Sequence, residues 1–481
     1  MRKADGYDAV VVGSGPNGLA GALTLAQAGR RVLVLEAAER AGGGLRTEEL
    51  TLPGYRHDVC ASVLPLAVAS PAFRALRENG LRIEFAHPPV PAAHPLDDGP
   101  AVLVHREAGR TAARLGRDGL AWQETVGATA RGGTPLVDTL LAPLDLPRAP
   151  LAAARFGPLG LLPATTLCRA VFRTAPARAV LAGMAAHSML DLRSPISGGF
   201  GLMLAALAHM AGWPVVRGGS QELADSMVKR LGDLGGEVVT GTRVRDLSEL
   251  PDADAVLLDV TPRQFLAMAG DRLPPRYRRR LARFRYGPGV FKVDWALSGP
   301  VPWRDPAVAG AGTVHLGGTL EEIAAAEAEV AGGRHPRRPF VLLAQPCVAD
   351  PSRAPAGRHT VWAYCHVPNG SAVDMTEAIE SQVERFAPGF RDLILARATR
   401  GPAELERHNA NLVGGDIGGG LASLAQFAGR PLYAARPWRT PLPGVYLCSA
   451  STPPGAGVHG MGGHRAARLA LADTRRRGPL R

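Results

Sequence analysis

Three glycines near the start of the chain have the spacing of a phosphate-binding loop. Gly13, Gly15 and Gly18 form the pattern G-x-G-x-x-G between the apolar run YDAVVVG and the small-residue segment NGLAGALTLAQAG. The first glycine allows a tight turn, the second lets backbone approach a pyrophosphate, and the third lets a helix pack on a strand. The N-terminus of that helix attracts negative charge. The residues predicted to bind a cofactor here are Gly13, Ser14, Gly15, Pro16, Asn17 and Gly18.

A carboxylate ends the second apolar run, at the position from which it could accept a hydrogen bond from the ribose of a dinucleotide. The second apolar run, RRVLVLEA, ends in Glu36, which lies 23 positions after Gly13. The spacing expected for an acid that binds a ribose hydroxyl is about 20 residues. The strand, glycine loop, helix and strand of residues 7–36 therefore predict one dinucleotide-binding unit. The sequence contains no second unit of this kind, so we expect no separate NAD(P) site.

A second glycine cluster comes directly after this unit, in the stretch EAAERAGGGLRTEEL. An acid that ends the second strand, then an Arg and a Gly-Gly pair, resembles the FAD-dependent amine-oxidase and phytoene-desaturase superfamily. The resemblance implies one FAD, with Arg40 and the backbone of residues 43–46 along its diphosphate. We expect the FAD to be bound non-covalently because the sequence has no recognisable Cys or His attachment motif. The residues that it adds to the predicted cofactor site are Ala37, Arg40, Gly43, Gly44, Leu45 and Arg46.

Near the other end, GAGVHG repeats the glycine spacing but does not form a second Rossmann unit. Five residues separate the strand predicted over 444–449 from Gly455, and no strand ending in an acid follows. The resemblance implies that this strand, loop and helix close over the flavin. A helix N-terminus stabilises negative charge, so we expect the turn of Val458, Gly460 and Met461 at the pyrimidine end of a reduced flavin. Ser449, Ala450 and Ser451 replace the Gly-Ala-Gly-like stretch usual in the family, which leaves the ribityl contacts open.

A third block completes the predicted cofactor domain. Residues 216–247 contain a glycine turn, a helix and a strand, and ADAVLLDVTP supplies a further strand. The resemblance implies that Val244 lies against the adenine. We therefore predict an α/β fold with a Rossmann-like FAD-binding domain in three blocks, 1–65, 215–285 and 410–481. Residues 66–214 and 286–409 are predicted to form an α+β substrate-binding domain.

The resemblance covers essentially the whole chain. The stretches YGPGVFKVDWALSGPVPW, ERFAPGF and GGDIGGG are most similar to bacterial phytoene-desaturase-like proteins. That group also resembles pyridine nucleotide-disulphide oxidoreductase domain protein 2. This resemblance implies the family to which the protein belongs but does not identify its substrate.

Histidine is the residue type best suited to proton transfer near neutral pH. His459 lies in the turn expected to face the flavin and is the preferred catalytic candidate, although a single histidine more often has a structural role such as packing the loop. Further candidates that also fit structural roles are His57, Asp58, His315, Tyr364, His366 and Asp416.

Composition excludes several classes of function. The formal net charge is +12, but lysine occurs only three times, so the basic charge is almost entirely arginine. With abundant Ala, Gly and Pro, this indicates a GC-rich bacterial genome, and we expect no nucleic-acid partner. Five scattered cysteines without a C-x-x-C pair predict neither a metal site nor a disulfide framework. No apolar run is long enough to span a membrane, so a cytoplasmic protein is expected.

The interval 146–190 is basic and apolar and contains no Asp or Glu. Such a segment can touch a membrane surface or gate a lipophilic tunnel, and it is equally compatible with ordinary burial that leaves arginines at the rim. Its arginines are Arg148, Arg155, Arg169, Arg173 and Arg178.

These features predict an FAD-dependent oxidoreductase that desaturates or oxidises a lipophilic, isoprenoid- or polyene-like substrate by hydride transfer to flavin N5. Amine oxidation competes with this prediction, but aromatic residues make up only 5% of the chain and the C-terminal flavin segment offers only Tyr446. The same features are compatible with a redox-neutral polyene isomerase that uses reduced FAD, and with a non-catalytic scaffold that binds FAD. The sequence leaves the substrate, the electron acceptor and the oligomeric state open.

Overall fold

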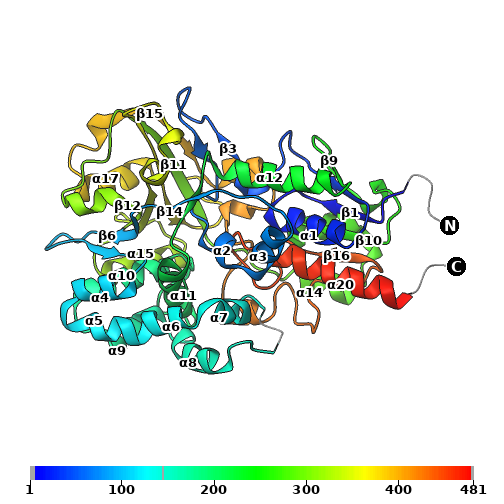
Figure 1. Cartoon of the computed structure of the whole chain (residues 1–481), viewed down its shortest axis with the longest axis horizontal. Coiled ribbons are helices and arrows are strands. Elements are labelled where there is room, and N and C mark those ends of the chain that lie inside the picture. Colours follow the sequence, from blue (N-terminus) through cyan, green and yellow to red (C-terminus); the bar gives the residue numbers. More distant parts are fainter. Residues whose placement is uncertain (1–5, 143–145, 478–481) are drawn as a thin grey trace.

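Short apolar runs from distant parts of the chain form one parallel sheet. The structure, a computed structural model, describes residues 6–142 and 146–477. All neighbouring strands of this first sheet are parallel, and it lies in the half of the molecule that carries β1 and β10 in Figure 1. Its strands, in spatial order, are β16 (Val445–Leu447), β10 (Ala255–Leu258), β1 (Ala9–Val12), β2 (Val32–Leu35) and β9 (Glu237–Val239).

Helices cover both faces of the first sheet because its strands are apolar on both sides. Val11 and Leu257 face a core shared with α1, α12 and α20, whereas Val12 and Leu258 face a core shared with α13 and α14. Helix α3 packs with α1 although it lies beyond residue 65, where the predicted boundary of the cofactor domain falls. These helices are α1 (Pro16–Gln27), α3 (Pro71–Glu78), α12 (Ser220–Asp233), α13 (Pro262–Ala269), α14 (Pro275–Leu281) and α20 (Met461–Arg477).

A second, mixed sheet forms the other half of the molecule. Its strands are antiparallel except for one parallel pair, β12 with β6. In spatial order they are β15 (Ile394–Arg400), β11 (Gly289–Leu297), β14 (His359–Val367), β13 (Val341–Ala344), β12 (Ala311–Leu316), β6 (Val90–His94) and β7 (Val102–Val104).

Helices flank this second sheet as well. Leu342 and Trp362 face a core with α9, α10, α11 and α15, whereas Leu343 and Val361 face a core with α17. The helices of this half are α4 (Ala108–Arg114), α5 (Gly119–Trp122), α6 (Ala128–Arg131), α7 (Gly133–Leu140), α8 (Pro150–Gly160), α9 (Ala164–Val171), α10 (Ala175–Ala186), α11 (Ser197–Met210), α15 (Leu320–Ala331), α16 (Pro346–Ala349) and α17 (Thr376–Phe386).

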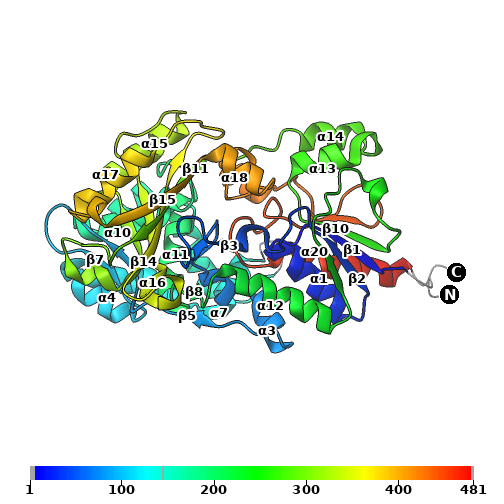
Figure 2. The same cartoon turned by 90° about the horizontal axis from the view of Figure 1, so that it is seen from above.

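Connecting segments lie between the two halves. Figure 2 shows α18 (Pro402–His408) and the hairpin of β3 (Thr47–Glu48) and β4 (His57–Asp58) in this position. The remaining elements are a second short strand pair and two short helices: β5 (Phe85–Ala86) with β8 (Val215–Val216), α2 (Pro65–Ala69) and α19 (Leu424–Ala428).

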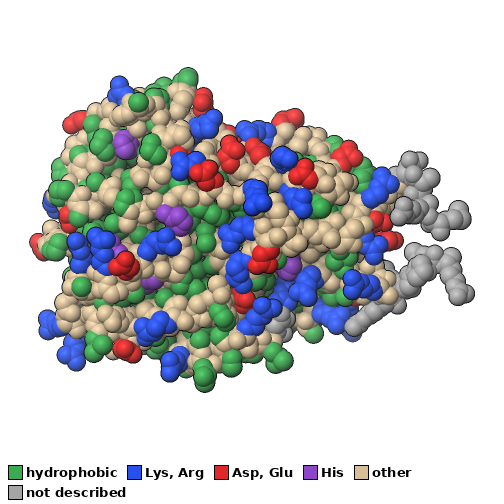
Figure 3. Space-filling model, viewed as in Figure 1, with side chains coloured by type: hydrophobic (Ala, Val, Ile, Leu, Met, Phe, Trp, Pro, Cys, Tyr) green, Lys and Arg blue, Asp and Glu red, His purple; other side chains and the backbone are tan. Residues whose placement is uncertain are grey.

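The predicted fold class is confirmed: a parallel Rossmann-like sheet is joined to an additional sheet domain. Figure 3 shows basic side chains scattered over both halves of one face, with acidic ones among them. Within the described residues no single helix is both long and apolar enough to cross a membrane. Helices α8 and α9 together reach that length, but the chain bends by 105° between them.

Candidate functional site

The first glycine loop connects β1 to α1 by a turn that only small residues allow. Gly13 has φ of +97°, a left-handed conformation that strains any other residue. A Cβ on Gly18 would lie 2.1 Å from the carbonyl oxygen of Gly13. The first turn of α1 therefore packs closely against the end of β1, as the glycine spacing predicts.

The side chain of Asp259 lies inside this loop, and no motif in the sequence singles it out. Its Oδ2 accepts a hydrogen bond from the backbone N–H of Gly18 at 2.9 Å. A Cβ on Gly15 would lie 2.7 Å from the same oxygen. Burial raises the pKa of Asp259 to about 7, and the charge of Glu36 acts in the same direction, against the Gly18 hydrogen bond. Asp259 directly follows β10, so an acid after the apolar run AVLL was the available signal, because neighbouring parallel strands end at one edge of the sheet.

Glu36 connects β2 to the same loop. Its Oε2 accepts hydrogen bonds from the backbone N–H of Ser14 at 2.9 Å and from the Ser14 hydroxyl at 2.6 Å. Its Oε1 accepts one from the N–H of Ala38 at 2.9 Å and lies 3.5 Å from the guanidinium of Arg46. Because Glu36 also lines the cavity described below, Oε1 remains an acceptor for a ligand hydroxyl.

The second glycine cluster packs directly on the first. The N–H of Gly42 donates to the backbone oxygen of Ser14 at 3.2 Å. A Cβ on Gly43 would lie 2.9 Å from Cα of Gly15. No side chain fits at Gly43 between the two loops, which explains why this position of the cluster is glycine.

The side chains of Arg40 and Leu45 do not face the cavity, and for Leu45 the prediction concerns the backbone alone. The side chain of Arg40 is 58% exposed and pairs with Asp225 at 3.7 Å, so it points to the surface and not along the cavity. Leu45 is fully buried in the core shared by α1 and α12. From residues 40–46, the cavity lining includes Gly43, Gly44 and Arg46.

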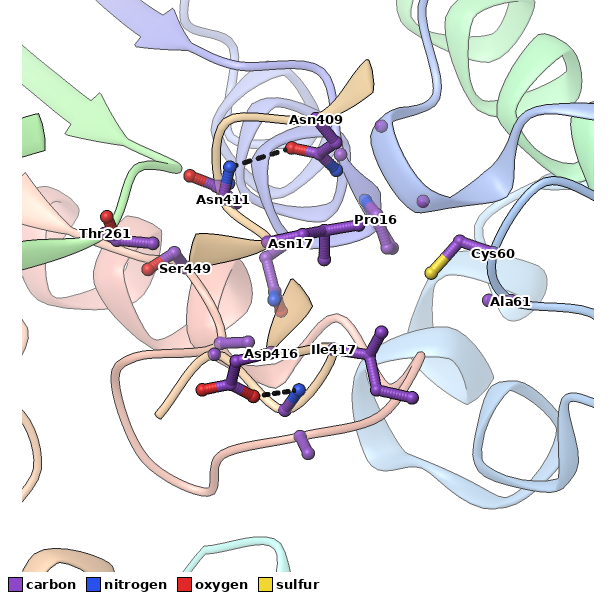
Figure 4. Close-up of a pocket in the computed structure, with 18 of the residues that line it drawn as sticks. Pro16, Asn17, Cys60, Ala61, Thr261, Asn409, Asn411, Asp416, Ile417 and Ser449 are labelled. Atoms are coloured by element: carbon purple, nitrogen blue, oxygen red, sulfur yellow. Dashed lines mark hydrogen bonds between the residues drawn. The ribbon is translucent and has the colours of Figure 1, made fainter. Parts of the chain in front are cut away.

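A cavity of about 830 Å³ extends from the glycine loop into the second half of the molecule. Its size lies in the upper part of the range of ligand sites, about 300–1,000 Å³. Figure 4 shows Asn17, Asn411 and Asp416 on its walls, with Cys60 on the side of the second half. The predicted residues that line it are Gly13, Gly15, Pro16, Asn17, Glu36, Ala37, Gly43, Gly44, Arg46, Val244 and Val458; those that do not are Ser14, Gly18, Arg40, Leu45, His459, Gly460 and Met461.

Seven described residues of this cavity wall have a polar side-chain atom that is buried without a hydrogen-bond partner. At the cofactor end and in the connecting segments they are Oδ1 of Asn17, Oδ1 of Asn411, Nε2 of His408 and Nε of Arg430, and in the second half they are Oγ of Ser188, Oγ1 of Thr313 and Nε1 of Trp362. An unpartnered buried polar atom is costly, so these atoms are suited to contacts with a bound ligand.

The C-terminal loop places His459 differently from the prediction. Its Nε2 lies 3.1 Å from the carbonyl oxygen of Gly455, and its Nδ1 accepts from the N–H of Met461 at 3.1 Å. Ser70 donates to its backbone oxygen at 2.7 Å. Burial lowers the pKa of His459 to about 4. Both ring nitrogens hold the loop itself, so the geometry favours the packing role, while the neighbouring Val458 faces the cavity.

The GGDIGGG stretch forms another wall of the cavity. The carboxylate of Asp416 accepts hydrogen bonds from the N–H groups of Gly287, Gly418 and Gly420 at 2.7–2.8 Å. Burial raises the pKa of Asp416, against these hydrogen bonds and the charge of Arg430. Asp416 therefore fixes the turn, which is the structural role that its sequence context allows.

The far end of the cavity is lined mostly by aromatic and apolar side chains, with the polar atoms of Ser188 and Thr313 among them. The rings of Trp362 and Tyr364 are stacked, 6.0 Å apart and inclined by 12°. Trp213 packs edge-on against His187, with ring centroids 5.4 Å apart. Apart from Arg407 of the connecting helix α18, residues 66–214 and 286–409 contribute no Asp, Glu, Lys or Arg to the described cavity lining. The lining residues at the far end are His187, Ser188, Met189, Phe200, Leu204, Trp213, Thr313, Leu342, Trp362 and Tyr364.

Among the remaining catalytic candidates, only Tyr364 and Asp416 line the cavity. His315 is buried behind His187, with their Nε2 atoms 2.9 Å apart. His366 pairs with Glu327 at 2.9 Å inside the second half. His57 and Asp58 are buried in the β3–β4 hairpin, where Arg353 pairs with Asp58 at 2.8 Å.

Comparison with known proteins agrees with this architecture. The NAD(P)-binding Rossmann-like domain family matches residues 11–78. Pyridine nucleotide-disulfide oxidoreductase domain-containing protein 2 of Rattus norvegicus is 26% identical, over 97% of this chain and 94% of that protein. Phytoene dehydrogenase of Streptomyces griseus is 28% identical, over 81% of this chain and 78% of that protein. The homology predicted from the sequence is thus confirmed.

Solved structures show the same fold. An oxidoreductase from Methanosarcina mazei superposes with a TM-score of 0.63 at 15% identity, over 97% of this chain and 100% of that one. A triple mutant of putrescine oxidase superposes with a TM-score of 0.61 at 20% identity, over 98% of this chain and 99% of that one. Cyclohexylamine oxidase from Brevibacterium oxydans gives 0.57 at 16% identity, over 98% of both chains. The named neighbours are an oxidoreductase and two amine oxidases, and at these identities the likeness shows a shared fold.

Proposed function

We propose that this chain, which shares the fold of amine-oxidase flavoenzymes and is homologous to phytoene desaturases, is an FAD-dependent oxidoreductase that acts on a lipophilic substrate. One observation carries the proposal. A single cavity connects the glycine loop of a Rossmann unit to an aromatic, uncharged end in the other half of the molecule.

The cofactor end fits a dinucleotide. Glu36 offers an acceptor for a ribose hydroxyl, and α1 begins at the cavity wall with Pro16 and Asn17, so the positive end of its dipole lies there. The unpartnered Oδ1 atoms of Asn17 and Asn411 add polar contacts. Val244 and Val458 also line the cavity, and they suit the adenine and the flavin ring respectively. When bound, FAD supplies the electron acceptor for oxidation of a C–H bond.

The far end fits a neutral, apolar substrate. Leu204, Trp213 and Leu342 supply apolar walls, and binding there removes apolar substrate surface from water. The charged side chains on the cavity wall belong to the segments around the cofactor end. An isoprenoid- or polyene-like molecule could therefore bind along the apolar part of the cavity with one C–H bond next to the flavin. There we expect hydride transfer to flavin N5.

Amine oxidation is a second candidate because the stacked pair Trp362 and Tyr364 could bind a cation. However, Lys292 already lies over the Trp362 ring, with Nζ 5.4 Å from the centroid. No described carboxylate from the second half faces the cavity to pair with an ammonium group. Both observations favour the neutral substrate.

A lipophilic substrate is found in a membrane, so we expect this protein to be cytoplasmic and to contact the membrane surface peripherally. Helix α8 leaves Leu151 exposed, and Leu146 and Leu161 beside it are also exposed. Arg148 and Arg155 lie in the same segment, which suits an anionic lipid surface. Sedimentation with anionic vesicles tests this contact, and loss of sedimentation is expected when Leu151 is changed to Asp.

The experiment that tests the function begins with the flavin. The purified chain is expected to release one FAD per chain on denaturation. Anaerobic stopped-flow absorbance then compares flavin reduction by a polyene in detergent with reduction by putrescine or cyclohexylamine. Reduction by the polyene alone supports the proposal, and reduction by an amine alone contradicts it.

A pair of variants connects the reaction to the far end of the cavity. Leu204→Asp is expected to retain FAD but to slow reduction by the polyene at least tenfold. Leu395→Asp, at a position that is 48% exposed and outside the cavity, is the matched control. Isomerised product without net flavin reduction would indicate a redox-neutral isomerase, and reducible flavin without turnover would indicate a scaffold.

A further inference from the structure

The glycine loop at the cofactor end is built around a carboxylate. A Cβ on Gly13 would lie 3.0 Å from the backbone oxygen of Asp259, and a Cβ on Gly15 or Gly18 would lie 2.7 or 3.1 Å from its Oδ2. All three motif glycines thus face this one residue. We propose that Asp259 is a cofactor-binding residue that stands beside the diphosphate as a protonated acid, so that loading of FAD takes up one proton. This inference rests on the proposed FAD site.

Asp259 occupies the helix end at which the diphosphate of the proposed FAD would bind. Asp259 lines the cavity and accepts the N–H of Gly18 in the first turn of α1. The N-terminus of a helix that follows a glycine loop is also where a diphosphate binds. Two anions held at this short range in a buried site repel each other, and protonation of the carboxyl group removes the repulsion.

The surroundings of Asp259 do not supply a compensating cation. Within residues 6–142 and 146–477 it forms no ion pair. The groups that shift its pKa are the carboxylate of Glu36 and the N–H of Gly18, and its own charge, after burial, raises the pKa of the nearby Cys448 thiol. Burial and Glu36 raise the pKa of Asp259 to about 7 before any ligand binds. A diphosphate shifts it further in the same direction.

The number of protons taken up on FAD binding depends on the pH. Below pH 7 the carboxyl group already carries its proton, and FAD binds without a net change in protonation. Above pH 7 the free protein is a carboxylate, and each FAD that binds takes one proton from solvent. Linkage then requires the apparent Kd to rise by up to tenfold for each pH unit above 7.

The test uses the full chain, freed of FAD and reconstituted. Quenching of FAD fluorescence gives the Kd from pH 6 to pH 9, and calorimetry at pH 8 in two buffers of different ionisation enthalpy counts the protons taken up. For the unaltered chain we expect a flat Kd below pH 7, a rise of about tenfold per unit above it, and close to one proton per FAD. Asp259→Asn, which retains an oxygen for the Gly18 N–H, is expected to bind FAD with a flat pH profile and no proton uptake.

Asp416→Asn is the matched control because Asp416 is another buried, cavity-lining acid whose pKa burial raises. It is expected to retain the slope and the proton uptake, whatever its Kd. A flat profile for the unaltered chain, an unchanged slope in Asp259→Asn, or loss of FAD binding by a folded Asp259→Asn protein would overturn the inference. If Asp259→Asn does not fold, the number of protons that the unaltered chain takes up per FAD at pH 8 still tests the inference, because a value near zero contradicts it. Failure of the unaltered chain to bind FAD at any pH would instead contradict the proposed function.

Discussion

At the scale of single residues, Glu36 both holds the glycine loop and faces the cavity. Its carboxylate accepts two hydrogen bonds from Ser14, at 2.9 and 2.6 Å. Glu36→Ala is expected to weaken FAD binding by about 1–3 kcal/mol, the scale of a hydrogen bond to a charged group. Fluorescence titration measures this effect, and the exposed Glu39→Ala is the control. Equal Kd values for Glu36→Ala and the unaltered chain would place the ribose elsewhere.

His459 leads to a different expectation once its partners are known. Both its ring nitrogens hold the backbone of residues 455–461. Removal of the ring leaves the N–H of Met461 without its acceptor, so His459→Ala is expected to lower the free energy of unfolding by about 1–3 kcal/mol. A thermal melt and stopped-flow reduction on the same variant separate the two roles. Slower flavin reduction with an unchanged melting temperature would restore His459 as the catalytic candidate.

At the scale of elements, close packing of α1 on α20 brings the C-terminal block to the glycine loop. A Cβ on Gly463 would lie 1.7 Å from the carbonyl oxygen of Asn17 and 2.7 Å from the N–H nitrogen of Gly21. Gly463→Ala is therefore expected to destabilise the protein by about 1–3 kcal/mol or more, although alanine is the better helix former.

The control is a glycine in an open helix position. Nothing lies within 4 Å of a Cβ on Gly157 in α8. Gly157→Ala is expected to raise stability by about 0.5–1 kcal/mol. Thermal melts of the two variants check the pair, and a stabilised Gly463→Ala would mean that α1 and α20 are farther apart.

Local pattern explains which elements could be predicted. The β1–α1–β2 unit, β16 and α20 follow from apolar runs, glycine turns and helix-forming segments that are continuous in sequence. The partner of the glycine loop does not, because Gly18 and Asp259 are 241 residues apart and meet only through the order of strands in the sheet. The surface position of Arg40 likewise depends on α12, which supplies Asp225. The second sheet is assembled from strands that are far apart in the chain, so its order could not be read from sequence.

At the scale of the whole molecule, buried histidines in both halves determine how stability depends on pH. Burial lowers the pKa of His187 to about 3 and of His94, His459 and His464 to about 4, from 6.5. Burial also lowers that of His315. The unfolded chain therefore binds more protons than the folded one between pH 6.5 and pH 4. Their contribution to stability is complete above pH 6.5 and is lost as the pH falls through this window, by at most about 1.4 kcal/mol per unit for each group.

We therefore expect the melting temperature of the FAD-free chain to fall steadily from pH 6.5 to pH 4. Asp259 opposes this trend, because its folded pKa is raised from 3.8 to about 7 and its proton stabilises the folded chain as the pH falls. Asp259→Asn should thus make the loss of stability in acid steeper, by at most about 1.4 kcal/mol per pH unit, the largest contribution of a single titrating group. Thermal melts of both proteins at intervals of half a pH unit measure the two slopes. A melting temperature that stays constant from pH 6.5 to pH 5 would show that these histidines are hydrated and charged in the folded chain, and an unchanged slope in Asp259→Asn would show that its carboxyl group is already ionised there.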